Sequence, residues 1–189
     1  MGEDKTMSIF QDRGGSALLV IDVQNGVVDS AFAREHVIAN INQTIKKARE
    51  KSIPVIWVQH SDEELVIDSH AWQIVHELVP QAGDIKIRKI FRNSFEETEL
   101  ESILASLQVD RLFICGAQTN NCVRHTCHAA LERGYDITLI KDGHTTSDYE
   151  WKGRTVVAEN VINEQNDNLF NYTLPNRSAR VIESSAITF

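Results

Sequence analysis

The sequence lacks long hydrophobic runs and clusters of basic residues. Its longest apolar run, residues 17–21, is far too short to cross a bilayer, which takes about 20 residues. Lys and Arg number 19 against 27 Asp and Glu, so the net charge is −8. Nucleic acids and anionic membranes both select clustered positive charge. We therefore expect neither nucleic acid nor a membrane as a partner.

Cysteine is also scarce. The three cysteines lie within one short segment, at Cys115, Cys122 and Cys127. An odd number of cysteines placed this close together is not a disulfide framework and is typical of a reducing compartment. The first fifteen residues contain acids and no apolar stretch, so they do not resemble a secretory signal. These features predict a cytoplasmic protein.

Low-complexity stretches and internal repeats are absent as well. The chain has 189 residues, of which 42% are hydrophobic. A chain of this length buries about 70% of the surface of its unfolded form, which is enough for one core. We therefore expect a single domain over residues 1–189, in which residues 1–14 form a flexible N-terminal lead.

Short apolar runs alternate with longer amphipathic segments along the chain. The continuous run at residues 17–23 is typical of a buried parallel strand, and apolar residues at helical spacing follow at 36–50. Further strands are predicted at residues 54–59, 84–90, 111–115, 136–140 and 179–182, and further helices at 71–78, 98–107, 122–133 and 152–170. This alternation predicts an α/β fold, a three-layer, doubly wound parallel sheet of about six strands with helices on both faces and Rossmann-type strand order.

Polar residues stand at the carboxyl ends of the predicted strands, where open α/β sheets bind ligands. Asp22 ends the first strand, Lys89 ends the third, and the turn after the fourth leads to Cys122. Cysteine is nucleophilic as a thiolate, and both a helix N-terminus at Cys122 and the charge of Lys89 would lower its pKa. Asp22 would accept the thiol proton, and backbone N–H groups of residues 116–122 would hold a developing oxyanion.

Each of these residues also has an ordinary structural interpretation. A cysteine in a helix is usually a small buried hydrophobe, and we assign that role to Cys115 and Cys127. Asp22 alone could begin a turn, and Lys89 alone could be a solvated surface residue. Their common position on one sheet edge favours a nucleophilic hydrolase. A nucleotide-binding Rossmann protein would need three spaced glycines after the first strand, where DVQNGVVDS has one.

Four motifs, in this order, resemble those of the isochorismatase-like cysteine hydrolases. They are LLVIDVQN with Asp22, KIFRNSF with Lys89, Ser94 and Phe95, GAQTNNCVRHTCHAALERGY with Cys122, and KDGHTTSD after the fifth predicted strand. The resemblance extends from about residue 16 onward. It implies a catalytic triad of Asp22, Lys89 and Cys122. It also implies a cis peptide between Ala117 and Gln118, which aims the N–H groups of Gln118 and Cys122 at one oxyanion.

The activity that the resemblance implies is hydrolysis of a C–N bond. The substrate would be a small amide or carbamoyl compound, the intermediate a thioester on Cys122, and no cofactor would take part. Two alternatives remain open: hydrolysis of a vinyl ether, as in the isochorismatases that give the family its name, and a non-catalytic binding protein on the same fold. Members of the family form homo-oligomers, so a dimer or tetramer is expected.

Nicotinamidases of this family bind a divalent metal through an Asp–x–His pair after the second strand. The corresponding segment here reads HSDEE from His60, and that pair is missing. We therefore expect no metal, although His60, Asp62 and His70 together would offer suitable ligand types. The substrate pocket is expected to contain Gln24, His60, Phe95, Ala117 and Trp151.

Overall fold

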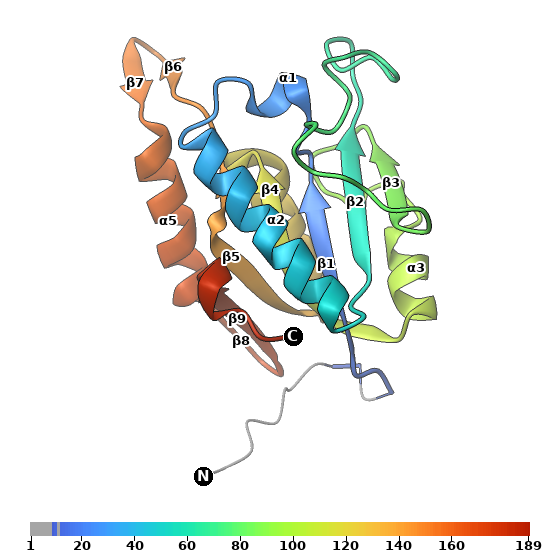
Figure 1. Ribbon diagram of the computed structural model, residues 1–189. Helices are drawn as coiled ribbons and strands as arrows, with labels where there is room; N and C mark the ends of the chain where they lie inside the picture. Colours follow the sequence, from blue (N-terminus) through green and yellow to red (C-terminus); the bar gives the residue numbers. More distant parts are fainter. Residues whose placement is uncertain (1–8, 11) are drawn as a thin grey trace.

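The structure, a computed structural model, describes residues 9, 10 and 12–189. Its strands are β1 (Gly15–Ile21), β2 (Val55–His60), β3 (Ile85–Lys89), β4 (Val109–Ala117), β5 (Asp136–Thr145), β6 (Tyr149–Trp151), β7 (Arg154–Val156), β8 (Thr173–Leu174) and β9 (Arg177–Ile182). Seven of them form one sheet in the order β3-β2-β1-β4-β5-β9-β8, and β6 and β7 form a separate pair (Figure 1). Neighbours in the sheet are parallel except β8 and β9. The predicted parallel α/β fold is confirmed, with the short β8 as an additional strand.

Helices cover both faces of this sheet. They are α1 (Asn25–Val28), α2 (Arg34–Glu50), α3 (Leu100–Ser106), α4 (Arg124–Arg133) and α5 (Ala158–Phe170). The long helix α2 lies on one face, and α3 and α4 pack on the other together with Leu169 of α5 (Figure 1). Among the described residues, no helix combines the length and the apolar character needed to cross a membrane.

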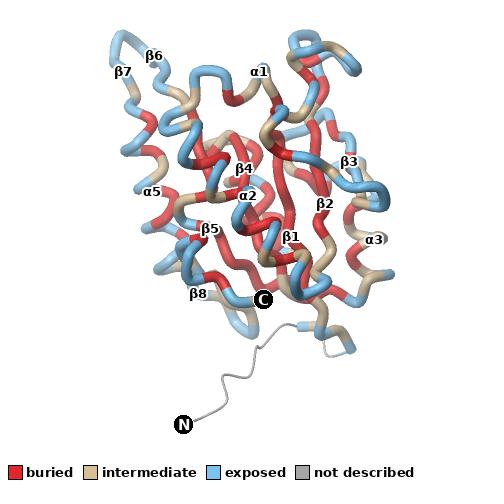
Figure 2. The backbone as a smooth tube through the Cα atoms, viewed as in Figure 1, coloured by how far each residue is buried: buried red, intermediate tan, exposed pale blue. Residues whose placement is uncertain are grey.

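The side chains of β1 alternate between two hydrophobic cores. Ala17, Leu19 and Ile21 belong to the core that faces α3 and α4, whereas Leu18 and Val20 belong to the core that faces α2. All five are at most 1% exposed. Successive side chains of a strand point to opposite faces, so a strand that is buried on both faces is apolar throughout. The central strands are accordingly buried along their length (Figure 2).

Residues 71–78, which were predicted as a helix, form an irregular segment instead. The backbone of this segment pairs with residues that follow β1. Asn25 N donates to Gln73 O at 2.9 Å, and Gly26 N donates to Ala71 O at 2.9 Å. These long-range hydrogen bonds take the place of the bonds between residues four apart that a helix requires. The segment is thereby held beside the carboxyl end of β1.

The helix predicted over residues 152–170 begins later, because the hairpin of β6 and β7 precedes α5. The turn between the two strands is formed by Lys152 and Gly153, whose φ angles are 50° and 75°. Two consecutive residues with positive φ are typical of a tight two-residue hairpin turn. Helical periodicity in the sequence therefore starts only at Ala158.

The N-terminal lead predicted over residues 1–14 lies only partly within the described chain, since residues 1–8 and 11 are outside the described residues. The ring of Phe10 lies 4.9 Å from the ring of Tyr135. Arg13 Nη1 donates to the Tyr135 hydroxyl oxygen at 3.1 Å. The described part of the lead is thus in contact with the segment that joins α4 to β5.

Gly116 marks a close approach between β1 and β4. Its φ is 124°, and a Cβ at this position would lie 2.0 Å from the carbonyl oxygen of Ile21. We expect Gly116→Ala to lower the free energy of unfolding by more than about 3 kcal/mol. The added Cβ forces the backbones of β1 and β4 apart, and an alanine at this φ is also strained. Urea unfolding measures this loss.

Gly153→Ala is the matched control for that substitution. Gly153 also has a positive φ, 75°, but nothing lies within 4 Å of an added Cβ. The expected loss is about 1–2 kcal/mol, which is the cost of a left-handed alanine alone. Equal losses for the two variants would contradict the steric explanation for Gly116.

Candidate active site

Three polar side chains meet where β1, β3 and the turn after β4 end. Asp22 follows β1, Lys89 is the last residue of β3, and Cys122 lies in a single π-helical turn, Thr119–Val123 (the Cys122 turn). Lys89 Nζ donates to Asp22 Oδ2 at 2.6 Å and to Cys122 Sγ at 3.2 Å. The structure therefore brings together the three residues that the sequence analysis placed at this edge.

The backbone bends sharply on both sides of the site. Asp22 has a φ of 49°, a left-handed conformation that is uncommon outside glycine. The peptide bond between Ala117 and Gln118 is cis, and Asn121 leaves the helical range with φ −116° and ψ −105°. Cys122 was expected to begin the helix after β4. Because the Cys122 turn intervenes, α4 instead begins two residues later.

Burial dominates the acid–base properties of Asp22 and Cys122. The side chains of Asp22 and Lys89 are 1% and 0% exposed, and Cys122 is 9% exposed. Burial raises the pKa of Asp22, and the positive charge of Lys89 opposes that rise. Burial, together with the negative charge of Asp22, raises the pKa of Cys122 to about 12. The cysteine pKa is therefore raised, not lowered as expected, and the resting side chain is a thiol.

One oxygen of Asp22 remains available to that thiol. Oδ2 accepts the hydrogen bond from Lys89, whereas Oδ1 is buried and has no nitrogen or oxygen partner in the described part of the chain. After burial and the charge of Lys89, the neighbouring Cys122 side chain also affects the pKa of Asp22 and lowers it. Asp22 can thus hold Lys89 with one oxygen and receive a proton on the other.

A cavity of about 450 Å³ opens onto Asp22 and Cys122. Its size suits a small-molecule ligand. Its wall also contains Gly26, Val27, His60, Asp62, Glu64, Leu65, Ala71, Arg92, Gln118 and Asn121. Charged, amide and apolar groups thus surround one side of the thiol.

Of the residues predicted to line the substrate pocket, His60 lies in the wall of this cavity. Trp151 lies in the wall of an adjoining cavity of about 780 Å³. The two cavities have Arg92, Gln118 and three other wall residues in common. Trp151 itself is 58% exposed.

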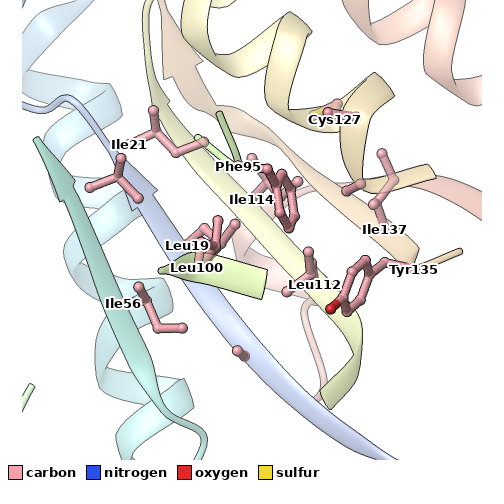
Figure 3. Close-up of a cluster of buried hydrophobic side chains, with 14 of the residues drawn as sticks. Leu19, Ile21, Ile56, Phe95, Leu100, Leu112, Ile114, Cys127, Tyr135 and Ile137 are labelled. Carbon is pink, nitrogen blue, oxygen red and sulfur yellow. The ribbon is translucent and has the colours of Figure 1, made fainter. Parts of the chain in front are cut away.

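The other three residues predicted for the pocket lie behind the cavity wall. Phe95 packs in the hydrophobic core, where its ring stacks on Tyr135 with 5.9 Å between centroids (Figure 3). Gln24 is fully buried, and its amide nitrogen donates to the Trp72 carbonyl at 2.8 Å. Ala117 is fully buried in the core that faces α2. These three residues support the site and do not form its surface.

His60 connects the site to the loop that follows β2. Its Nδ1 lies 3.3 Å from Lys89 Nζ, and its Nε2 lies 3.3 Å from Asp62 Oδ2. Burial and the charge of Lys89 lower the pKa of His60. His70, in contrast, is exposed. Within residues 9, 10 and 12–189, no three His, Cys, Asp or Glu side chains are grouped as a metal site, so His60, Asp62 and His70 are not assembled into one.

Several cavity residues were missed by the sequence analysis. Asn121 stands inside the motif GAQTNNCV, directly before Cys122, and that proximity is the signal that could have found it. Glu64, Leu65 and Ala71 come from the irregular segment after β2. That segment contains no motif and no clear periodicity, so nothing local identifies these three.

A buried histidine behind the Cys122 turn was also missed. His144, in β5, is 1% exposed. Its Nδ1 lies 2.9 Å from Thr119 Oγ1, and its Nε2 lies 3.0 Å from Asn166 Oδ1. Burial lowers the pKa of His144 to about 4, so the imidazole is neutral at physiological pH.

This pKa makes the stability of the fold depend on pH. Below pH 6.5 the unfolded chain takes up a proton at His144, whereas the folded protein does so only near pH 4. Acid therefore favours unfolding, and the stabilisation is lost as the pH falls. Relative to His144→Asn, we expect the wild type to lose about 2 kcal/mol of unfolding free energy between pH 7 and pH 5. Parallel urea titrations measure the difference, and identical pH dependences would contradict a buried neutral histidine.

Comparison with known proteins supplies an independent line of evidence. The sequence model of the isochorismatase domain matches residues 16–158. Streptothricin hydrolase of Streptomyces noursei is 29% identical over 138 residues, which cover 70% of this chain but only 55% of that protein. Ureidoacrylate amidohydrolase RutB of Enterobacter sp. (strain 638) is 29% identical over 169 residues, covering 67% of this chain and 74% of that protein. The crystal structure of an isochorismatase from Pseudomonas putida KT2440 superposes with a TM-score of 0.82 at 25% identity, over 92% of this chain and 90% of that one.

Proposed function

The chain belongs to the isochorismatase family of hydrolases, and we propose that it hydrolyses a C–N bond in a small amide or carbamoyl compound. One observation carries the proposal: Lys89 Nζ contacts both Asp22 Oδ2, at 2.6 Å, and Cys122 Sγ, at 3.2 Å, beside a cavity of small-molecule size. In this proposal Cys122 is the nucleophile, Asp22 transfers protons, and Lys89 keeps Asp22 charged.

The first step is attack of the Cys122 sulfur on the carbonyl carbon of the substrate. A thiol whose pKa is raised to about 12 does not ionise alone near neutral pH, so its proton passes to Asp22 as the C–S bond forms. Burial raises the pKa of Asp22, which makes it a stronger base than an ordinary carboxylate. The carbonyl electrons move onto oxygen, and the N–H groups of Gln118 and Cys122 stabilise that oxyanion.

The second step breaks the C–N bond. The oxyanion electrons re-form the carbonyl group, Asp22 returns its proton to the departing nitrogen, and a thioester remains on Cys122. Asp22 is then a carboxylate again and can activate a water molecule. Attack of that water breaks the C–S bond, and the sulfur regains its proton from Asp22. The products are an amine or ammonia and an acid, and the resting thiol is restored.

Lys89 has an electrostatic task throughout this cycle. A buried carboxylate without a partner would take up a proton and could no longer act as a base. The ammonium group of Lys89 offsets the effect of burial on Asp22. Because the same group also contacts Cys122 Sγ, it stabilises the partial negative charge that develops on the sulfur while the C–S bond forms or breaks.

Amide chemistry is favoured over vinyl ether hydrolysis by the position of the thiol. Cys122 is in the cavity wall beside a proton acceptor, an arrangement that a nucleophilic mechanism requires and a protonation mechanism does not. The likeness to a ureidoacrylate amidohydrolase supports the same choice.

A screen for thioester formation tests the proposal. The wild-type protein is incubated with a panel of small carboxamides, carbamoyl compounds and esters. The reaction is quenched in acid, and the mass of the intact protein is measured by mass spectrometry. We expect at least one compound to be hydrolysed and to leave an acyl adduct on Cys122. Cys122→Ala is expected to abolish both the hydrolysis and the adduct. Asp22→Asn is expected to lower turnover by about a hundredfold or more, because the base is lost.

Cys127→Ala is the matched control, since Cys127 is a fully buried cysteine in α4. It should keep both turnover and adduct. Absence of an adduct with every compound would contradict the proposal. If turnover survives in Cys122→Ala but not in Asp22→Asn, the reaction is hydrolysis of a vinyl ether and not of an amide.

A further inference from the structure

The carboxyl end of β5 lies alongside the Cys122 turn. The pairing of β4 with β5 shifts between Ile114 and Gly116, and beyond that shift Gly116 pairs with His144 and Ala117 with Thr145. β5 therefore continues past the point where regular pairing would have ended. It accompanies the chain up to the cis peptide that precedes the turn. Residues at the end of β5 therefore lie next to the Cys122 turn and can form hydrogen bonds with it.

The hydrogen bonds of His144 have a defined direction. Asn166 Nδ2 donates to the carbonyl oxygen of Lys141 at 3.3 Å, which leaves Asn166 Oδ1 as the acceptor facing His144. His144 Nε2 must therefore carry the proton that it shares with Asn166 Oδ1 at 3.0 Å. The neutral imidazole then has a lone pair on Nδ1. Thr119 Oγ1, at 2.9 Å, donates its hydroxyl proton to that lone pair.

A second hydrogen bond joins the same part of the chain to the next residue of the turn. Thr146 Oγ1 donates to Asn120 Oδ1 at 2.9 Å, and Thr146 is 1% exposed. Thr119 itself is fully buried. Two consecutive residues of the turn, immediately after Gln118, are thus held by side chains from residues 144–146. Neither bond involves Lys89 or Asp22.

From this arrangement we propose that His144 is a positioning residue for acyl transfer. By accepting the Thr119 hydroxyl proton on Nδ1, it fixes the backbone between Gln118 and Cys122, and so fixes where the N–H groups of those two residues point. The proposal rests on the function proposed above, because it assigns these N–H groups to the oxyanion. A histidine that served packing alone would need no directed acceptor, and an apolar side chain would be buried at lower cost.

The proposal separates two reactions of the same sulfur. Acylation of Cys122 passes through an oxyanion, so it depends on where the N–H groups point. Alkylation displaces a leaving group at a saturated carbon and forms no oxyanion. A misplacement of about 1 Å in a reacting geometry can lower a rate by about a hundredfold. Loosening the turn should therefore slow acylation much more than alkylation.

Thr119→Val is the variant that tests this, because it keeps the side-chain shape and removes the donor. Acylation is followed as the p-nitrophenolate burst from p-nitrophenyl acetate, and alkylation by iodoacetamide is followed by intact mass. We expect the acylation rate constant to fall at least tenfold, with less than a twofold change in the ester concentration at half-saturation. Alkylation of Cys122 should change by less than threefold. Thr119→Ser, which restores the hydroxyl, should recover most of the acylation rate.

Three further variants test whether a loss of stability explains the result. Thr44 is also fully buried, and its Oγ1 donates to the Asn40 carbonyl in α2 at 2.8 Å. Thr44→Val should lower stability and leave both rates unchanged. His144→Asn keeps an acceptor close to the position of Nδ1, whereas His144→Leu does not, so acylation should be faster in His144→Asn than in His144→Leu.

The outcomes distinguish this inference from the function on which it rests. If Cys122→Ser gives the same burst as the wild type, the nucleophile itself is wrong and both proposals fail. If the burst depends on Cys122 but Thr119→Val acylates at the wild-type rate, the role of His144 alone is overturned. An equal fall in acylation and alkylation would likewise overturn it, because that pattern reports general disruption of the site.

Discussion

The buried ion pair between Lys89 and Asp22 is the contact on which the rest of the site depends. Each charge would lose hydration worth several kcal/mol on burial, so neither can be placed there without the other. β1 and β3 are not neighbours but are joined through β2, and the two side chains still meet at 2.6 Å. The parallel ladders must therefore hold both strand ends in fixed register. At Asp22 the chain adopts a left-handed conformation. The regular alternation of side chains along β1 therefore ends there, at the residue whose carboxylate contacts Lys89.

The pair also determines what Cys122 can do. A cysteine beside a cation alone would have a lowered pKa and would rest as a thiolate. Here the carboxylate lies next to the same sulfur, and burial adds to its effect, so the pKa of Cys122 is raised to about 12. In the mechanism that we propose, the thiol keeps its proton until a carbonyl carbon is within reach. Asp22, which raises the pKa of the thiol, is then also the group that takes the proton, so transfer from Cys122 to Asp22 replaces a separate histidine base.

The features that the sequence predicted are those set by local periodicity. Continuous apolar runs identified the parallel strands, and their ends identified Asp22, Lys89 and Cys122. Failures arose where contacts distant in sequence decide the structure. Residues 71–78 were predicted as a helix, but the carbonyl groups of Ala71 and Gln73 accept hydrogen bonds from residues that follow β1. Phe95 stands in a motif near Lys89, yet it packs behind the cavity against Tyr135. His144 stands inside the motif KDGHTTSD, yet its role was missed, because its partners Thr119 and Asn166 come from elements far away in the chain.

The residues to which we assign the reaction and those that line the rest of the cavity come from different parts of the fold. The former stand at or just after strand ends, and many of the latter stand in loops. The ion pair stands at the ends of strands held by main-chain ladders across the sheet, so its position does not depend on a loop side chain. A third of the cavity wall, in contrast, comes from the segment after β2, namely Asp62, Glu64, Leu65 and Ala71, and Arg92 of the loop after β3 lines the same cavity. Side chains of opposite charge therefore line one cavity, and a substrate must present groups that suit both. Reaction type can therefore be inferred from motifs at strand ends. Substrate identity depends on side chains whose placement is fixed by long-range contacts such as the hydrogen bond from Gly26 to Ala71.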